Sequence, residues 1–316
     1  MNDKIENLLE ENRKFSPKTE LTQNANATSK WFDDANENRL EFWKKQALER
    51  ITWFKEPSEI LDDSNPPFFK WFKDGELNLS YNCLDRHLET DSDRVAFYWE
   101  GEPGDTQEIT YQDLYERVCR LSNALKKLNV KKGDRVAIYL GMTPEIVVAM
   151  LACARIGAVH SVVFGGFSSE ALADRINDAK AKLVITADGA WRRGDIVPLK
   201  DNVDGSLELT EYIENVIVVK RTNQDIDMKQ GRDHWYHEIT EKEQSVCEPE
   251  IMNAEDMLYI LYTSGTTAKP KGIVHTQAGY LTGVTTTHHE VFDIKDDDIY
   301  WCAADCGWVT GHSYIV

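Results

Sequence analysis

Short apolar runs alternate with longer helical patterns along most of the chain, and this alternation constrains the fold more than any other feature. Runs typical of strands occupy residues 94–99, 135–140, 158–164, 182–187, 215–220 and 257–263, and a further one occupies 298–304. The runs are largely continuous rather than alternating in polarity, as expected for strands covered on both faces. Strands that alternate with helices predict an α/β fold with a mainly parallel sheet and right-handed crossovers.

Two of the intervening helices carry clear signals at their ends. Thr110 precedes the helical pattern of residues 111–128, and Asp113 stands in its first turn, which is a capping arrangement. Pro144 opens a second pattern, and Gly157 follows it at the position where helices commonly end in a left-handed residue. We therefore expect helices over both ranges.

The part of the chain before these strands is rich in aromatic residues set among charges. Residues 36–54 have the pattern of an amphipathic helix. Because aromatic rings need a surface that covers them, we expect this arm to pack on a larger body. The polar stretch at 221–250 is predicted to be a long surface excursion.

Charge and composition exclude several classes of protein. The chain has 36 Lys and Arg against 54 Asp and Glu, a net charge of −18 that repels nucleic-acid phosphates and anionic lipid. Its longest apolar stretch, 146–154, is far below the roughly 20 residues of a membrane span. The first fifteen residues lack the apolar core of a secretory signal, and the six cysteines lack zinc-site spacing. We expect a cytoplasmic protein with reduced thiols, no bound metal of its own, and no nucleic-acid or membrane partner.

A loop rich in hydrogen-bond donors follows the run at 257–263. Four hydroxyls, two lysines and two glycines fall within residues 263–272, a composition suited to an anion such as a polyphosphate. It is not a Walker A loop, because Pro270 separates the two lysines and no Gly-Lys-Ser/Thr triplet occurs. A surface loop without a ligand is the alternative. The predicted phosphate-binding residues are Thr263, Ser264, Gly265, Thr266, Thr267, Ala268, Lys269, Lys271 and Gly272.

This string closely resembles the phosphate-loop signature of the AMP-forming adenylating enzymes, with Ala268 where that family usually has glycine. Three other stretches, 66–87, 149–172 and 301–316, look like acetyl-CoA synthetases and their short-chain relatives. The resemblance runs from about Trp31 to the last residue. It implies the large N-terminal α/β domain of the adenylate-forming superfamily, with mainly parallel sheets and flanking helices.

The resemblance also implies a division of the chain. Residues 1–92 would be the aromatic-rich helical arm of the acetyl-CoA synthetase type, and residues 93–316 the first part of the AMP-binding domain. The family is about twice as long as this chain, which ends in the apolar stretch Tyr314–Val316. We therefore expect a truncated N-terminal half without the small C-terminal domain. The catalytic residues are expected outside it, so the chain alone is predicted to be inactive.

The reaction implied by the resemblance joins a small carboxylate, with acetate first, to CoA. ATP and the carboxylate form an acyl-adenylate and diphosphate, and the CoA thiol then displaces AMP. Lys269 and Lys271 would neutralise the negative charge as diphosphate leaves, and Mg²⁺ would contribute to the same neutralisation. The protein ligand of the Mg²⁺ ion is expected beyond residue 316. A non-catalytic nucleotide- or CoA-binding module, or another adenylating enzyme such as a peptide-synthetase domain, are the alternatives.

Two further sets of residues are assigned by the resemblance. Arg192, Arg193, Gly194 and Asp195 match the segment that contacts the phosphates of CoA, with Asp195 where relatives usually carry Lys or Arg. Trp308, Val309 and Thr310 match the lining of the acyl pocket, and Thr310 is also expected to contact CoA. The residues themselves also allow a solvated loop at 192–195 and core packing at 308–310.

Three remaining positions are interpreted from their context. Gly165 and Gly166 allow either a close approach of CoA or backbone, or a tight strand-to-helix turn capped by Ser168. His275 is expected to pack at the start of the helix that follows the phosphate loop. No arrangement of Ser, His and Asp points to a nucleophile with its base.

Overall fold

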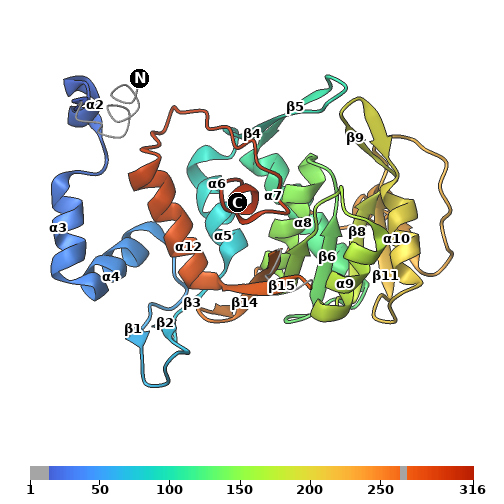
Figure 1. Ribbon diagram of the computed structural model, residues 1–316, viewed down its shortest axis with the longest axis horizontal. Helices are drawn as coiled ribbons and strands as arrows, with labels where there is room; N and C mark the ends of the chain where they lie inside the picture. The colour runs from blue at the N-terminus through green and yellow to red at the C-terminus, as the bar shows by residue number, and fades with distance from the viewer. Residues whose placement is uncertain (1–13, 264–268) are drawn as a thin grey trace, which may run out of the picture.

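A seven-stranded sheet forms the centre of the computed structural model, which describes residues 14–263 and 269–316 (Figure 1). Its strands run in the order β12-β11-β8-β6-β7-β14-β15, and all are parallel except β15, which pairs antiparallel with β14. The predicted mainly parallel α/β sheet is confirmed. The strands are β6 (Arg135–Tyr139), β7 (Val159–Val162), β8 (Leu183–Ala187), β11 (Asn215–Val219), β12 (Asp233–Trp235), β14 (Met257–Thr263) and β15 (Lys271–Thr276).

Helices cover both faces of the sheet. The crossovers from β6 to β7 and from β7 to β8 run in opposite directions, so right-handed connections place their helices on opposite faces. One face carries α8, which packs against α7, and the other carries α9, which packs against α10. Their bounds are α7 (Tyr111–Lys127), α8 (Pro144–Arg155), α9 (Ser169–Ala179) and α10 (Leu199–Leu207).

The predicted helix ends are confirmed. The Thr110 side chain accepts from the Asp113 amide while the Asp113 carboxylate accepts from the Thr110 amide, which completes a capping box at α7. Helix α8 begins at Pro144 and ends before Gly157, whose φ is +72°. Between the sheet and α7, α8 buries nearly all of its side chains, and every residue of β7 and β8 is buried as well.

Two of the predicted strands differ from the structure. The run at 94–99 forms β4 (Val95–Glu100), which pairs with β5 (Thr106–Thr110) in a separate hairpin instead of joining the main sheet. The connection after β4 is too short for a crossover to a parallel neighbour. Residues 298–304 form no strand, since no pairing partner lies beside them among the described residues, and Ile299 and Trp301 are 78% and 84% exposed.

The polar stretch at 221–250 is only partly a surface excursion. It contains β12, which adds the edge strand beyond β11, and the short helix α11 (Tyr236–Thr240). An edge strand is held by backbone hydrogen bonds from one side, so a polar sequence can form it without an apolar signal.

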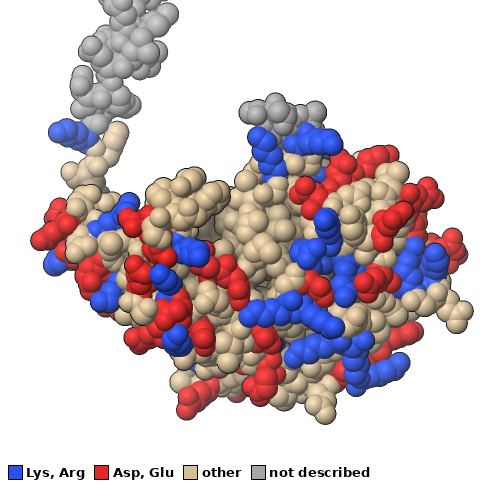
Figure 2. Space-filling view, turned by 90° about the horizontal axis from the view of Figure 1, so that it is seen from below, with Lys and Arg blue, Asp and Glu red and all other residues tan. Residues whose placement is uncertain are grey.

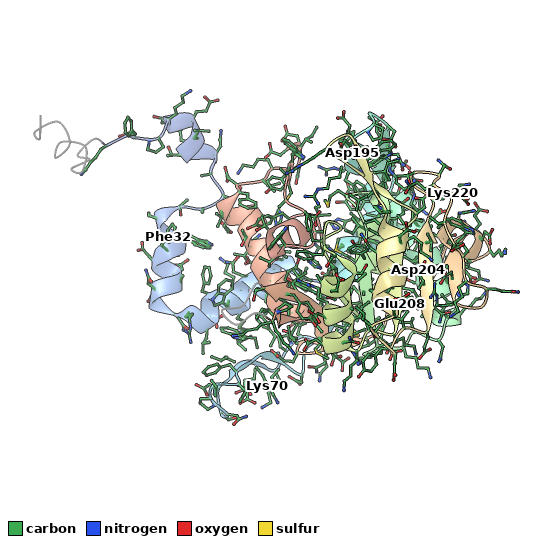
Figure 3. The ribbon with its side chains drawn as sticks, turned by 45° about the vertical axis from the view of Figure 1, so that its right-hand side comes forward. Phe32, Lys70, Asp195, Asp204, Glu208 and Lys220 are labelled. Carbon is green, nitrogen blue, oxygen red and sulfur yellow. The ribbon has the colours of Figure 1, made fainter. Side chains whose placement is uncertain are left out.

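The N-terminal arm packs on the body through several helices: α5 contacts α8, α6 contacts α7, and α4, which carries some of the arm's aromatic residues, contacts α12. Helix α4 lies against α12 and buries Phe42, whereas Phe32 on α3 remains 61% exposed (Figures 1 and 3). The expected packing of the arm is therefore confirmed for α4. The elements here are α2 (Thr19–Asn24), α3 (Ser29–Glu37), α4 (Arg39–Arg50), β1 (Glu59–Asp62), β2 (Lys70–Lys73), β3 (Glu76–Leu77), α5 (Leu79–Cys83) and α6 (Asp85–Asp91).

The remaining elements are short and surround the sheet. They are β9 (Ala190–Arg192), β10 (Asp195–Val197), β13 (Met252–Asn253), α12 (Gln277–Thr286), the π-helix η1 (Thr287–Val291) and α13 (Val309–Ser313). Acidic and basic side chains are interspersed over the face shown in Figure 2. Within residues 14–263 and 269–316, no helix combines the length and apolar character needed to cross a bilayer.

Candidate functional site

The segments that carry the predicted site residues meet at one edge of the sheet. Strands β6, β7, β8 and β14 are parallel, so their carboxyl ends lie on the same side. The chain order reverses at β6, because β7 lies on one side of it and β8 on the other. Ligands of α/β sheets bind outside the carboxyl ends at such a switch point. The loops that follow β7, β8 and β14 are therefore the candidate site.

Strand β14 delivers the predicted phosphate loop to this edge. Its central residues are buried, while Thr263 at its end is exposed and pairs with Lys271 in β15. Ser264, Gly265, Thr266, Thr267 and Ala268 lie outside the described residues. Lys269, Lys271 and Gly272 are exposed, and neither lysine forms an ion pair within the part of the chain that the structure describes. Two exposed ammonium groups thus follow the undescribed residues, and no carboxylate among the described residues pairs with them.

The predicted CoA residues form the tip of the β9–β10 hairpin. Arg193 and Gly194 have φ of +55° and +86°, as in the two-residue turns that suit a hairpin's twist. Arg192 and Asp195 pair across the hairpin, and the Gly194 amide donates to the Glu102 carboxylate of the β4–β5 turn. Asp195 lies near the margin of the molecule in Figure 3, and both Asp195 and Arg193 are exposed. Gly194 therefore has a backbone role, and Arg193 is free to meet an anion.

Phe164 joins the hairpin to the predicted acyl-pocket residues. The Arg192 guanidinium lies 4.5 Å from the centroid of the Phe164 ring, and the Trp308 ring centroid lies 6.4 Å from it. Burial raises the pKa of the nearby Asp305 carboxyl above its usual range, and the Gly307 amide and Arg192 oppose that rise. Phe164, which the sequence analysis did not single out, thus contacts both the predicted CoA residues and the predicted acyl-pocket residues.

The glycines near Phe164 lie where a Cβ atom would come too close to neighbouring atoms. A Cβ on Gly166 would lie 2.3 Å from Arg192 Nη1, and one on Gly307 would lie 2.8 Å from the Phe164 amide nitrogen. A Cβ on Gly165 would lie 3.1 Å from the Leu140 carbonyl oxygen at the end of β6. Ser168 accepts from the Ala171 amide and caps α9, so the strand-to-helix turn is confirmed. The close neighbours of these glycines are protein atoms.

Helix α13 presents the predicted acyl-pocket residues at its start. Trp308 and Val309 are 51% and 50% exposed, and Thr310 is exposed as well. These side chains do not pack in the core, in contrast to the alternative that the sequence left open. The His312 amide donates to the Trp308 carbonyl at 3.1 Å, which closes the first turn of the helix.

A buried cluster of histidines and tyrosines joins α13 to the sheet, and the sequence analysis did not predict it. We define the His–Tyr cluster as His160 on β7, Tyr259 on β14, Tyr280 on α12 and His312 on α13. His312 Nε2 lies 2.7 Å from His160 Nε2, and His312 Nδ1 lies 2.7 Å from the Tyr280 hydroxyl. The Tyr259 ring stacks on His312 with centroids 3.9 Å apart.

Burial sets the protonation of this cluster. It lowers the pKa of His160 to about 3, and burial with weaker repulsion from His160 and His275 lowers that of His312 far below its usual range. Both rings are therefore neutral at neutral pH. A histidine within the apolar run 158–164 was the available sequence signal for this cluster.

His275 is not at the start of a helix as expected. It lies in β15, where it pairs with Tyr259 and stacks on that ring at 4.4 Å between centroids, and α12 begins only at Gln277. The strand continues through Thr276 because its pairing with β14 extends to Met257.

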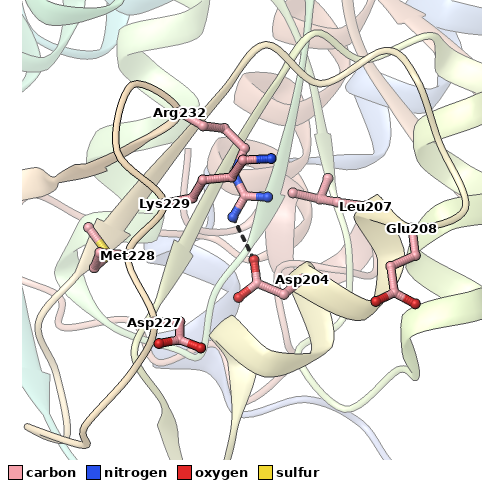
Figure 4. A pocket seen from close by; sticks show the side chains of 7 residues that line it. All are labelled: Asp204, Leu207, Glu208, Asp227, Met228, Lys229 and Arg232. Atoms are coloured by element: carbon pink, nitrogen blue, oxygen red, sulfur yellow. Dashed lines mark hydrogen bonds and ion pairs between the residues drawn. The ribbon is translucent and has the colours of Figure 1, made fainter.

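A polar cavity lies elsewhere, between the end of α10 and the segment before β12 (Figure 4). None of the predicted site residues lines it. Asp204 and Arg232 form an ion pair across it at 2.7 Å. Because β12 begins at Asp233, this cavity lies toward the amino ends of the parallel strands, opposite the candidate site.

Comparison with known proteins decides the family. A model for AMP-binding enzymes matches residues 84–316. The chain belongs to the AMP-binding enzyme family. A second model, for the N-terminus of acetyl-coenzyme A synthetase, matches residues 28–83. The resemblance inferred from the sequence is therefore confirmed.

Several acetyl-coenzyme A synthetases are similar to this AMP-binding chain. The protein of Streptomyces avermitilis is 58% identical over 99% of this chain and 48% of its own length. The protein of Streptomyces coelicolor is 56% identical over 100% of this chain and 48% of its own length. The protein of Pasteurella multocida is 55% identical over 98% of this chain and 48% of its own length. The chain thus spans about half the length of the curated relatives it matches. The similarity lies in their N-terminal half.

Proposed function

We propose that this chain is the N-terminal half of an AMP-forming acetyl-CoA synthetase. The full-length protein would join acetate to ATP, giving acetyl-adenylate and diphosphate, and CoA thiol would then displace AMP. The observation that carries the proposal is the convergence of the β14 exit, the β9–β10 hairpin and the start of α13 at one sheet edge. Sequence identity to acetyl-coenzyme A synthetases supports acetate as the acid.

The first step needs positive charge around the phosphates of ATP. Lys269 and Lys271 stand on both sides of Pro270 at the exit of β14, exposed and without ion pairs among the described residues. As diphosphate leaves, charge accumulates on its oxygens, and fixed ammonium groups stabilise that charge. Thr263 and the backbone of the loop would add hydrogen-bond donors.

We propose that Mg²⁺ takes part in the reaction and that none of the described residues coordinates it. When bound, the ion would share the neutralisation of the diphosphate. Across residues 14–263 and 269–316, no group of three or more His, Cys, Asp or Glu side chains could hold a metal ion. The described residues that follow the phosphate loop supply Lys269 and Lys271, and ammonium groups do not coordinate a cation.

The carboxylic acid and CoA would be bound by the residues that surround Phe164. Trp308 and Val309 offer an apolar wall for the methyl group of acetate, and the Thr310 hydroxyl can donate to CoA. Arg192 and Arg193 would meet the phosphates of CoA, with the negative charge of Asp195 opposing them. Propionate or a small hydroxy acid would be the next candidates for the pocket.

The chain spans about half the length of the acetyl-CoA synthetases that it resembles. We therefore propose that residues 1–316 alone do not complete the reaction. The six cysteines are all free, which suits a reducing compartment, and we propose that the enzyme acts in the cytoplasm.

The test is product analysis with the full-length protein. Acetate, ATP and CoA should yield AMP and acetyl-CoA in equal amounts, with no AMP when acetate is left out. Release of ADP, or turnover that does not depend on CoA, would contradict the proposal. Binding of ATP or CoA without any turnover would favour the non-catalytic module.

A further inference from the structure

The His–Tyr cluster connects the acyl-pocket helix to three other elements. His312 is fully buried, and its ring reaches β7 through His160 and α12 through Tyr280. Its third neighbour is the Tyr259 ring of β14. The two strands contacted are adjacent, and Tyr259 pairs with His160 across them. The helix that Trp308 precedes as its N-cap residue, by contrast, has only five residues.

Such a short helix needs an anchor from outside itself. Isolated turns of this length are unstable, because nucleation costs more than a few hydrogen bonds return. The first residues of α13 are exposed, so its hold on the sheet falls to the buried residues Gly311, His312 and Ser313. A Cβ on Gly311 would lie 2.1 Å from the Asp305 carbonyl oxygen, so the helix contacts the preceding loop directly.

The hydrogen bonds of His312 fix its ring in both directions. A neutral imidazole has one N–H, so only one of the facing Nε2 atoms of His160 and His312 carries a proton. If His312 donates to His160, the Tyr280 hydroxyl donates to His312 Nδ1; if His160 donates, His312 donates to the hydroxyl. Either arrangement satisfies both nitrogens of His312 and leaves His160 Nδ1 without a partner, as observed. An apolar side chain could fill this space but could not set the ring's orientation.

We propose that His312 is a positioning residue for the acyl pocket. By holding α13 to β7 and α12 through its two ring nitrogens, it fixes Trp308, Val309 and Thr310 at the carboxyl edge of the sheet. The inference rests on the proposed function for the role of these three residues. The anchoring of α13 itself does not depend on it.

The test compares His312→Phe and Tyr280→Phe with His275→Phe in the full-length protein. His312→Phe removes both hydrogen bonds, and Tyr280→Phe removes a single hydroxyl, so the latter keeps the test valid if the former does not fold. His275→Phe is the matched control, since His275 stacks on the same Tyr259 ring from β15. Amide hydrogen exchange of residues 308–316 and the KM for acetate are measured.

Both cluster variants should raise exchange in residues 308–316. Tyr280→Phe should raise the KM for acetate about tenfold, as expected for one lost buried hydrogen bond, and His312→Phe, which loses two, should raise it further. In these two variants, the KM for ATP and the exchange in residues 135–139 should stay within about twofold of wild type. In the control His275→Phe, all of the measured quantities should stay within that range. Unchanged exchange at 308–316 in both cluster variants would overturn the anchoring, and equal rises in KM for acetate and ATP would overturn the positioning role. A wild-type protein without acetate-dependent activity would refute the proposed function, while the exchange result would still decide the anchoring.

Discussion

The two edges of the parallel sheet use charge in opposite ways. At the amino edge, Lys200 is fully buried and lies 2.6 Å from the Asp204 carboxylate and 3.1 Å from that of Asp233. At the carboxyl edge, Lys269, Lys271 and Arg193 are exposed and form no ion pair within residues 14–263 and 269–316. Charges that the fold pairs internally hold elements together. Cations left unpaired beside a switch point are available to a ligand.

The largest expected effect is on stability and comes from the amino edge. Lys200→Met leaves the buried Asp233 carboxylate short of one partner, and we expect it to lower the free energy of unfolding by about 3–5 kcal/mol. Urea unfolding measures this change. Lys229→Met is the control, because Lys229 lines the cavity beside Asp204 but its side chain forms no ion pair with another described residue. A loss below 1 kcal/mol for Lys200→Met would show that this network is not structural.

The carboxyl edge should respond in activity rather than in stability. Lys271→Met should lower kcat/KM for AMP formation by about 100-fold, the usual effect of removing one electrostatic stabiliser of a transition state. Lys70→Met is the matched control, since Lys70 is likewise an exposed lysine on a short strand (Figure 3). Equal activity in the two variants would remove Lys271 from the site.

Much of this contrast could be predicted from the sequence. Continuous apolar runs identified β6, β7, β8, β11 and β14, and the phosphate loop after β14 stays a prediction from its donor-rich string. Strand order could not be predicted, because it depends on which faces meet and not on local pattern. The separate hairpin of β4 was misjudged for that reason, and β12 was missed because an edge strand can have a polar sequence.

The links between distant side chains were also beyond the sequence. Phe164 lies between Arg192 and Trp308 only because the loops after β7 and β8 and the start of α13 share one edge. His312 meets His160 across a separation of 152 residues. Nothing in either local sequence signals that contact.

Acid should weaken the packing beneath the carboxyl edge. His160 and His312 have pKa values lower in the folded chain than in the unfolded chain, so the unfolded chain binds more protons as pH falls below about 6.5. Stability should therefore be full above pH 6.5 and be lost toward pH 3, by up to about 1.4 kcal/mol per pH unit for each histidine.

Urea unfolding at several pH values measures this slope. The slope between pH 6.5 and pH 5 should be shallower in His160→Phe than in His237→Phe, which changes an exposed histidine and leaves both buried histidines in place. Identical slopes in the two variants would contradict the claim that His160 and His312 are both neutral in the folded chain.

The smallest expected effect concerns Asp195. Asp195→Lys adds a cation beside Arg193 and should lower the KM for CoA about threefold, as expected for an exposed charge interaction. Glu208→Lys makes the same change of charge at the amino edge, where Glu208 lines the cavity of Figure 4. Steady-state kinetics compare the two. The same shift in both variants would trace it to net charge rather than to the hairpin.

Chemical labelling of lysines tests the assignment of the ligand site most directly. The full-length protein is treated with an amine-reactive reagent with and without ATP, and the extent of modification at each lysine is measured by mass spectrometry. ATP should protect Lys269 and Lys271 and leave Lys70 and Lys229 unchanged. Protection at Lys229 in the amino-edge cavity, or none at Lys269 and Lys271, would contradict the claim that the carboxyl edge binds the nucleotide.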